Sequence, residues 1–379
     1  MDVFSLIKQA RENGCSDLHI TAGTAIAVRK YGELFMLDQV PTLEESEEMI
    51  LSLLKEDEAK FVLAGNDLDV AVSDEKGNRI RGNVYHQRNN LAASIRLIDS
   101  NIPTLSELNM PPVIQKLAEL RGGLVLVTGP TGSGKSTTLY TALSELNKED
   151  VNIITVEDPV EANIEGINQV QTNVKAGLTF ASALRSILRQ DPDIIMIGEI
   201  RDQETASIAV TASITGHLVV STLHTNSSAA SITRLADMGL EYYLIADSVV
   251  GVIAQRLVRR LCPTCRKERL ANEREKKILG CEGEEEVKIW DPVGCPQCGY
   301  NGYRGRIGVY ELMPISPRIR NIIASKGTTE QIENAALADG MYTLQMACSK
   351  HVKNAVTSIN ELKRIVYAGE DVDDAEATS

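Results

Sequence analysis

The stretch LVLVTGPTGSGKS, residues Leu124–Ser136, decides the fold of this chain. Its first half is a run of leucine and valine, which is typical of a buried parallel strand. Its second half matches G-x-x-x-x-G-K-[ST], with Gly129, Gly134, Lys135 and Ser136 at the required positions, and a sequence with helical spacing follows. A strand, a glycine loop and a helix in this order predict a nucleoside triphosphate site.

Each residue type in this loop has a chemical role there. Glycines allow the backbone to curl so that several N–H groups point at one phosphate, and the positive end of the following helix adds to the attraction. We expect Lys135 to reach the β and γ phosphates and the Ser136 hydroxyl to bind Mg²⁺. The residues that we expect to contact the nucleotide are Gly129, Thr131, Gly132, Ser133, Gly134, Lys135, Ser136 and Thr137.

The composition restricts what the rest of the chain can do. Its 379 residues suffice for two or three domains, and its net charge of −13 argues against bulk nucleic-acid binding. No apolar run approaches the ~20 residues that a membrane helix needs, and the first residues lack the apolar core of a signal peptide. We therefore expect a cytoplasmic protein that reaches a membrane only through partners.

Residues 1–100 are predicted to form a small α+β domain. Short alternating segments typical of strands surround a helix at 42–54, which opens with the capping-box pair Thr42 and Glu45. Three prolines mark residues 101–112 as a linker. Hairpin turns are expected at 31–33 and 88–90.

Residues 113–379 are predicted to form a second, larger domain. Strands and helices alternate up to about residue 260, which is the pattern of a mostly parallel α/β core. A cysteine-containing subdomain is expected at about 260–310 and a helical part at 315–370. The expected strands are 124–128, 152–156, 193–197 and 218–222, and the expected C-terminal helices are 316–325, 328–338 and 342–368.

Two of these apolar strands lead to acidic residues. One is followed by Glu199, and an earlier one by Glu157 and Asp158. Because parallel strands have their carboxyl ends on one edge of a sheet, we expect these acids near the glycine loop. There, one carboxylate can bind Mg²⁺ while the other orients or deprotonates water. The alternatives are that Glu199 is a surface loop residue and that Asp158 only caps a turn before Pro159.

The stretch Thr215–Asn226 contains two histidines, His217 and His224, on either side of an apolar strand. Seven residues apart, they point to opposite faces of an ideal strand, so they need not contact the same ligand. His224, at the strand end beside Thr222 and Thr225, is the better candidate for sensing the γ phosphate.

Four of the seven cysteines form two C-x-x-C pairs, Cys262 with Cys265 and Cys295 with Cys298. Each turn can direct two thiolates at one tetrahedral Zn²⁺, and four thiolates would complete the coordination shell. The pattern therefore predicts a structural zinc site. A redox-active pair is the alternative, but two pairs favour a metal. Cys281, between the pairs, is expected to be a spare residue.

The stretches GPTGSGKST, ITVEDPVE, RQDPDIIMIGEIRD and TGHLVVSTLHTN resemble, in this order, four motifs of the secretion-ATPase superfamily. The similar branch contains the motors of type II secretion and type IV pili, and the resemblance extends to residues 16–23 and 79–96. It implies an α/β fold with a PAS-like α+β N-terminal domain and a RecA-like P-loop ATPase domain. That second domain would carry a small zinc-binding subdomain and a helical C-terminus.

The resemblance also implies roles for individual residues. Glu157 would activate water, and Glu199 would act at Mg²⁺ and water. His217 and His224 would sense the nucleotide. The implied cofactors are ATP, Mg²⁺ and Zn²⁺, and the implied assembly is a homohexamer that hydrolyses ATP at its subunit boundaries.

Two arginines of the N-terminal domain complete the implied site. Arg81 and Arg96 match the arginines that this family supplies to the phosphates. An arginine that offsets charge on the transferring phosphoryl group is worth ~10³–10⁵ in rate in other enzymes. The alternative for both residues is a solvated strand face.

The cysteine module separates the branches of the family. Together with residues 299–313, it resembles the zinc-bearing subdomain of secretion and pilus-assembly ATPases, which pilus-retraction ATPases generally lack. The short N-terminal part is instead retraction-like. We give the cysteines more weight and expect an ATPase motor for pilus assembly or type II-like secretion, peripheral at the inner face of the cell membrane. Its expected partner is an inner-membrane platform protein, and the alternatives are a retraction motor or a nucleic-acid translocase.

Overall fold

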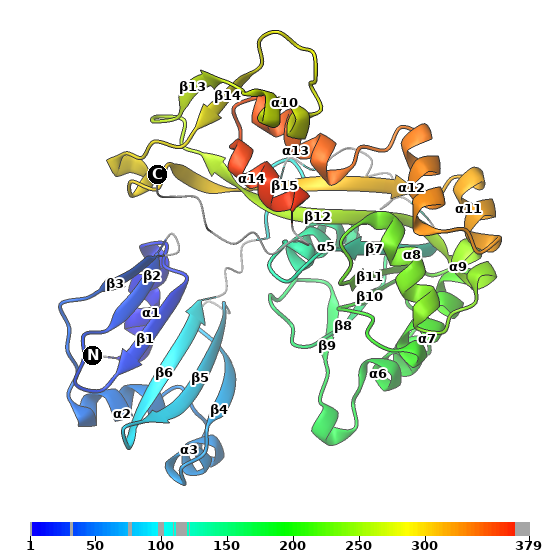
Figure 1. The fold of residues 1–379 in the computed structure, drawn as a ribbon. Coiled ribbons are helices and arrows are strands. Elements are labelled where there is room, and N and C mark those ends of the chain that lie inside the picture. Colours follow the sequence, from blue (N-terminus) through cyan, green and yellow to red (C-terminus); the bar gives the residue numbers. More distant parts are fainter. Residues whose placement is uncertain are drawn as a thin grey trace. The chain divides into compact units, whose positions relative to one another are not determined.

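The structure is a computed structural model that describes residues 2–30, 33–74, 78–97, 102–108, 110, 120 and 122–367. Contacts within the chain separate two compact units, which Figure 1 shows. One comprises Met1–Ile102 with Glu161–Asn163, and the other comprises Pro103–Val160 with Ile164–Ser379. Residues 101, 109, 111 and 112 of the predicted linker lie outside the described residues, so its bounds stay a prediction. Within the described ranges, no helix combines the length and apolar character that crossing a membrane requires.

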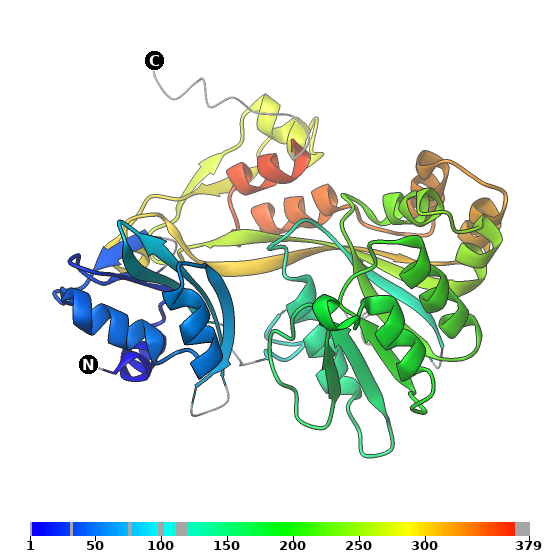
Figure 2. The ribbon, with the colours of Figure 1, turned by 90° about the horizontal axis from the view of Figure 1, so that it is seen from below.

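The first unit is a six-stranded antiparallel sheet in the order β3-β2-β1-β6-β5-β4, with helices packed on it (Figure 2). Strand residues alternate between buried and more exposed, as in the pattern of β1, because helix side chains cover one face of the sheet. Its elements are α1 (Val3–Glu12), β1 (Asp17–Thr21), β2 (Ala27–Lys30), β3 (Glu33–Met36), α2 (Leu43–Leu51), α3 (Glu56–Leu63), β4 (Leu68–Ser73), β5 (Arg79–Gln87) and β6 (Asn90–Leu97).

Local signals in this unit predicted its turns and caps. The capping box of α2 is confirmed, since Thr42 Oγ1 accepts from the Glu45 backbone and Glu45 Oε2 accepts from the Thr42 backbone at 2.8 Å. The hairpin turn between β5 and β6 is also confirmed. Arg88 and Asn89 both have positive φ, as tight two-residue hairpins require. The other predicted hairpin turn lies partly outside the described residues, although β2 and β3 do pair.

The second unit contains a seven-stranded sheet in the order β15-β12-β7-β11-β10-β8-β9. Six strands are parallel, and β15 pairs antiparallel with β12 at one edge. The predicted α/β fold class is confirmed, and the four predicted strands are correct to within a residue. The elements are β7 (Gly123–Thr128), α5 (Lys135–Leu146), β8 (Ile153–Glu157), β9 (Asn168–Gln171), α6 (Phe180–Ile187), β10 (Ile194–Ile197), α7 (Gln203–Ile214), β11 (Leu218–Leu223), α8 (Ser228–Asp237), α9 (Tyr242–Ser248), β12 (Val249–Leu261) and β15 (Tyr303–Pro314).

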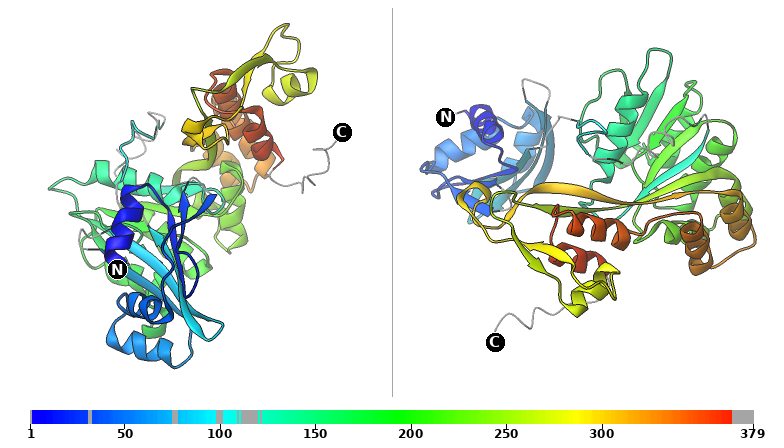
Figure 3. Two further views of the ribbon diagram at one scale, coloured as in Figure 1. Left: turned by 90° about the vertical axis from the view of Figure 1, so that its left-hand side faces the viewer. Right: turned by 90° about the horizontal axis from the view of Figure 1, so that it is seen from above.

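A small subdomain is inserted between β12 and β15, the long strand pair shown in Figure 3. It contains β13 (Lys267–Leu270), α10 (Glu273–Leu279) and β14 (Lys288–Asp291), and β13 pairs antiparallel with β14. Trp290 on β14 is the one tryptophan of the chain. Apolar side chains of this subdomain share a core with the last helices of the chain.

The C-terminal part is helical, as predicted, but one predicted helix is wrong in its extent. The helices are α11 (Pro317–Ala324), α12 (Thr329–Ala338), α13 (Leu344–Lys353) and α14 (Ile359–Val366). The expected helix at 342–368 breaks after Asn354, where Ala355 has φ 57°. Val356 N donates to His351 O at 2.9 Å, so the break is a Schellman motif with alanine where glycine is usual.

Candidate functional site

The glycine loop joins β7 to α5 at the carboxyl edge of the parallel sheet. Gly129, Gly132 and Gly134 have φ of 150°, 79° and 89°, the left-handed region that favours glycine. A Cβ on Gly129 would lie 2.5 Å from the carbonyl oxygen of Gln255, and one on Gly134 would lie 2.9 Å from Gln255 Nε2. The loop therefore needs glycine both for its backbone angles and for its close contact with β12.

Two side chains of the loop suit a phosphate ligand. Lys135 Nζ donates to the carbonyls of Gly129 and Pro130 at 2.8 and 3.0 Å, so the ammonium group already lies inside the loop. Ser133 Oγ is buried and has no hydrogen-bond partner among the described residues. A phosphate oxygen would give this hydroxyl an acceptor and would lie against the cation. The loop thus fits the group that the sequence predicts.

Gln255 on β12 supports the loop, and the sequence analysis did not identify it. Its Nε2 donates to Ser133 O at 2.9 Å, and its Oε1 accepts from Thr138 Oγ1 on α5 at 2.7 Å. A buried amide that bonds both the loop and the helix after it holds the cradle in shape. The only signal in the sequence is a glutamine that ends the apolar run Val249–Ala254.

Glu157 and Glu199 lie on the same edge of the sheet, because β8 and β10 are neighbouring parallel strands. β11 separates β10 from β7, so the Glu199 strand is not directly beside the strand of the glycine loop. The two acidic strand ends are therefore neighbours on the edge of the sheet that also carries the glycine loop. At ~5 Å per strand, the β10 backbone that leads to Glu199 lies ~10 Å from β7, and β8 with Glu157 lies ~15 Å from it.

The carboxylate of Glu157 is buried and accepts hydrogen bonds from two hydroxyl groups and one amide. Its Oε1 accepts from Thr155 Oγ1 at 2.6 Å and from Gln169 Nε2 at 3.0 Å, and its Oε2 accepts from the Tyr140 hydroxyl. These bonds orient Glu157 firmly between α5, β8 and β9.

Glu199 lies in a different environment, among charged and titratable groups. Its Oε1 is 2.6 Å from an Arg201 guanidinium nitrogen, and its Oε2 is 3.6 Å from His224 Nε2. Burial, followed by the nearby Lys135 charge, lowers the pKa of His224 against the opposing effect of Glu199. The imidazole is therefore neutral at neutral pH. The structure thus brings Glu199 and His224 together and places His224 within the electrostatic reach of the glycine loop.

His217 lies elsewhere in this unit. It precedes β11, whose first residue Leu218 pairs with Gly123 at the start of β7, whereas the glycine loop follows the end of β7. Six strand residues separate these edges by ~20 Å. Its Nδ1 lies 3.0 Å from the carbonyl oxygen of Ala212. Within one chain, His217 is therefore not brought to the glycine loop.

Arg81 and Arg96 belong to the first unit and lie directly opposite each other on β5 and β6. Arg96 also pairs with Asp17 on the neighbouring β1, with Nε 2.9 Å from Oδ1. Two like charges directly opposite in a sheet repel each other, and one carboxylate offsets only one of them. The structure therefore places both predicted arginines together on one sheet face.

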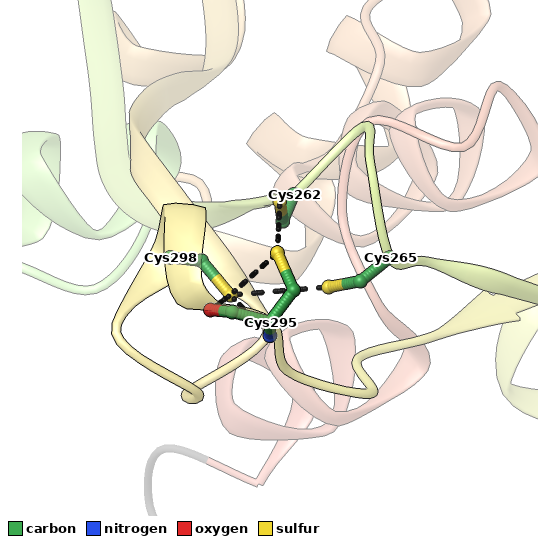
Figure 4. Close-up of side chains that lie close together, drawn as sticks. All are labelled: Cys262, Cys265, Cys295 and Cys298. Carbon is green, nitrogen blue, oxygen red and sulfur yellow. Dashed lines mark hydrogen bonds between the residues drawn. The ribbon is translucent and has the colours of Figure 1, made fainter.

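The four predicted cysteine ligands converge (Figure 4). The sulfur atoms are 3.8 Å apart in the pair Cys262–Cys295, 3.8 Å in Cys265–Cys298 and 3.7 Å in Cys295–Cys298. A tetrahedral zinc with Zn–S bonds of ~2.3 Å requires sulfur atoms ~3.8 Å apart. Backbone N–H groups of Gly294 and Cys295 also donate to the sulfur atoms of Cys265 and Cys298. The cluster therefore fits a Zn²⁺ ion.

A P-loop α/β fold with acidic strand ends defines a class of nucleotide-binding protein, and this chain adds a four-cysteine cluster whose geometry suits a metal ion. The chain belongs to the family described as type II/IV secretion system protein, which matches residues 3–364. This confirms the resemblance drawn from the sequence motifs.

Particular relatives come from two kinds of machine. Type II secretion system protein E of Aeromonas hydrophila is 49% identical over 277 residues, which cover 72% of this chain and 55% of that protein. The type IV pilus assembly ATPase PilB of Acinetobacter baylyi is 53% identical over 247 residues, which cover 64% of this chain and 42% of PilB. The chain thus spans about half the length of these two relatives.

A solved structure is also similar over nearly the whole chain. The pilus retraction motor PilT with bound ADP superposes with a TM-score of 0.68 and is 29% identical, covering 92% of this chain and 96% of that one. The similarity includes both units, so the order of the two folds in the chain is shared.

Proposed function

We propose that this chain is an ATP hydrolase whose turnover drives a pilus-assembly or type II-like secretion machine. The observation that carries the proposal is that Glu199 and His224 meet at the edge of the sheet where the glycine loop lies, in a chain of this family. A phosphate cradle beside a carboxylate and a neutral imidazole suits phosphoryl transfer to water. The names of the two curated relatives support the class of machine.

Within the subunit, we assign the nucleotide contacts to the glycine loop. The backbone of the loop, Ser133 and Lys135 would bind the phosphates, and Ser136 and Glu199 would hold Mg²⁺, which offsets phosphate charge when bound. Glu199 is the acid that would face the attacking water. We assign Glu157 to orienting the edge of the site, because Tyr140, Thr155 and Gln169 already occupy its carboxylate.

We also propose that Arg81 and Arg96 supply positive charge to the phosphates of this or a neighbouring subunit. Their direct opposition on one sheet face supports this, because an anion would relieve the repulsion between them. The proposed assembly is a cytoplasmic homohexamer at the inner face of the membrane, in contact with a platform protein and not with nucleic acid. The four cysteines would hold a structural Zn²⁺.

A retraction motor is the second candidate. The similarity to the pilus retraction motor PilT, at 29% identity and a TM-score of 0.68, favours it. Deletion of the gene separates the two candidates. Cells without pili support assembly, while hyperpiliated cells without twitching support retraction. A DNA-stimulated ATPase activity without any response to the platform protein would instead indicate a translocase.

Substitution of the two acids tests the proposed hydrolysis. Glu199→Gln is expected to lower the ATP turnover number by about 10²–10⁴-fold while ATP binding remains, because a general base or metal-facing acid is lost. Glu157→Gln is expected to lower stability first, because an amide N–H would face hydroxyl and amide donors. The exposed Glu165→Gln is the matched control. Full activity in Glu199→Gln would contradict the assignment.

A further inference from the structure

The carboxyl edge of the parallel sheet, with the glycine loop, Glu199 and His224, is called the nucleotide edge. Outside it, one buried carboxylate connects the first turns of two helices. Glu311 on β15 is 4% exposed, and no Lys, Arg or His in the described residues forms an ion pair with it. Its Oε1 accepts from the backbone N–H and the hydroxyl of Ser228, both at 2.7 Å, and its Oε2 accepts from Leu344 N at 3.3 Å. Ser228 begins α8 and Leu344 begins α13, so the positive ends of two helices stabilise one negative charge.

A second buried charge lies on the adjacent strand. Arg256 on β12 is 9% exposed, and its guanidinium donates to Asn226 Oδ1 at 3.2 Å and to Asn226 O at 3.4 Å. Ala254 is directly opposite Glu311 in the antiparallel pair, so Arg256 and Glu311 share one face of the sheet. Burial lowers the pKa of Arg256, and the Glu311 charge opposes that shift.

Both contacts bear on the loop His224–Ser227, which follows β11 and contains the proposed γ-phosphate sensor: Asn226 lies within it, and Ser228 directly follows it. Its other anchor is Thr225, whose backbone N–H donates to Thr128 Oγ1 at 3.0 Å, one residue before the glycine loop. The loop is therefore attached to β7 through Thr225, to β12 through Asn226 and to β15 through Ser228. Of these attachments, two depend on buried charged side chains.

We propose that Arg256 and Glu311 are positioning residues that hold His224 where it can contact the γ phosphate, and that through them the site is linked to α13. The inference rests on the proposed function. Neither residue touches the nucleotide in this arrangement. Each acts through a loop residue within four positions of His224.

The proposed link can be tested because ATP and ADP differ only in the γ phosphate. ADP lacks the γ phosphate, so the position of His224 affects the binding of a triphosphate and its turnover, but not the binding of ADP. A side chain that only stabilised the fold would change both affinities together, or neither. The ratio of the two affinities therefore separates positioning from stability.

The experiment uses Arg256→Met, which keeps the apolar stem and removes the donors, together with Asn226→Ala and the double variant. We expect Arg256→Met to lower the affinity for a non-hydrolysable ATP analogue about tenfold or more relative to ADP, and to lower the turnover number at least as much. Because Arg256 acts through Asn226, the double variant should be no weaker than either single variant. Arg256→Lys, which retains one donor, should restore part of the loss.

Arg259→Met is the matched control, because Arg259 lies on the same strand but pairs with Glu361, away from the loop. It should lower the unfolding midpoint and leave the analogue-to-ADP ratio unchanged. Glu311→Gln, which keeps the shape of the side chain, should reproduce the effect of Arg256→Met on the ratio. An unchanged ratio in Arg256→Met, or strictly additive effects with Asn226→Ala, would overturn the proposal. The binding ratio requires no turnover, so it tests the positioning role even if the chain proves not to hydrolyse ATP.

Discussion

The nucleotide edge and the four-cysteine cluster are built in opposite ways. At the nucleotide edge, the glycine loop follows β7, Glu157 ends β8, and Glu199 and His224 come after β10 and β11. The residues of these four strands are all buried. The cysteines lie in two short turns, at 262–265 and 295–298, joined to a subdomain rich in charged residues. The first site lies on the aliphatic core of the parallel sheet, whereas the second lies beside a smaller core that the subdomain shares with the last helices.

This difference concerns what each ligand does for the fold. Burial of apolar surface stabilises by roughly 25 cal/mol per Å², so the parallel sheet can form before any nucleotide binds. Two turns with four thiols bury little apolar surface, and a structural zinc would supply much of their folding free energy. We therefore expect the nucleotide to change the activity of a folded site, and the metal to decide whether the cysteine turns are ordered at all.

The largest effect should come from removing one cysteine ligand. Cys298→Ser should reduce bound zinc from about one per chain to well below one and lose a large part of the ~10–16 kcal/mol that four-ligand zinc binding supplies in small zinc domains. Metal analysis and hydrogen exchange over the cysteine turns measure this. The control is Cys15→Ser, a substitution in the first unit, and this variant should retain the zinc content of the wild type. Full zinc content in Cys298→Ser would show that the cluster is not the metal site.

The next largest effect should come from Lys135→Ala. Loss of one positioned charge at the phosphates is expected to lower turnover by about 10²–10³-fold, equal to about 3–4 kcal/mol. Because the Lys135 ammonium donates to backbone carbonyls of its own loop, the fold and the zinc content should stay unchanged. ATPase assays with metal analysis measure both, and exposed Lys175→Ala is the control. Zinc loss in Lys135→Ala would break the independence of the two sites.

The smallest effect concerns pH and lies on the side of the cysteine module. Burial, then Lys350 and Arg260, lower the pKa of His351 on α13 from 6.5. The unfolded chain therefore takes up this proton at higher pH than the folded chain. The contribution to stability is complete above pH 6.5 and is lost as the pH falls towards the lowered value.

His351→Asn should flatten this part of the stability profile, as measured by denaturant unfolding at a series of pH values. The exposed His86→Asn in the first unit serves as the control. An identical slope in wild type and His351→Asn would show that the acid sensitivity arises elsewhere in the chain.

Local chemistry made the glycine loop and the cysteine pairs predictable from the sequence. The loop needs glycine at positions set by its own backbone, and the thiols need only a short turn between them. The strands 124–128 and 218–222 were equally predictable, since continuous aliphatic runs are typical of parallel strands that are buried on both faces. The position of Glu157 and Glu199 on one edge of the sheet also followed from the parallel topology.

Features that depend on distant segments were not predictable. β12 was missed because its interior contains Gln255 and Arg256, whose partners lie more than a hundred and about thirty residues away. The two histidines of one motif look equivalent in the sequence, and only the length of β11 separates His217 from the site. The sequence has no glycine at the helix break. Ala355 takes the left-handed conformation there, and its carbonyl accepts a hydrogen bond from the distant Arg266 side chain.

Trp290 gives the cysteine subdomain a property that the nucleotide edge lacks. It is half-buried on β14, and the sequence contains no second tryptophan. Indole emission from this protein therefore originates in the cysteine subdomain, on the strand that precedes Cys295 in the chain, and nothing at the phosphate loop contributes to it. The unlabelled chain thus carries an intrinsic optical probe for one of its two sites, so metal loss can be followed in real time while catalysis is measured separately.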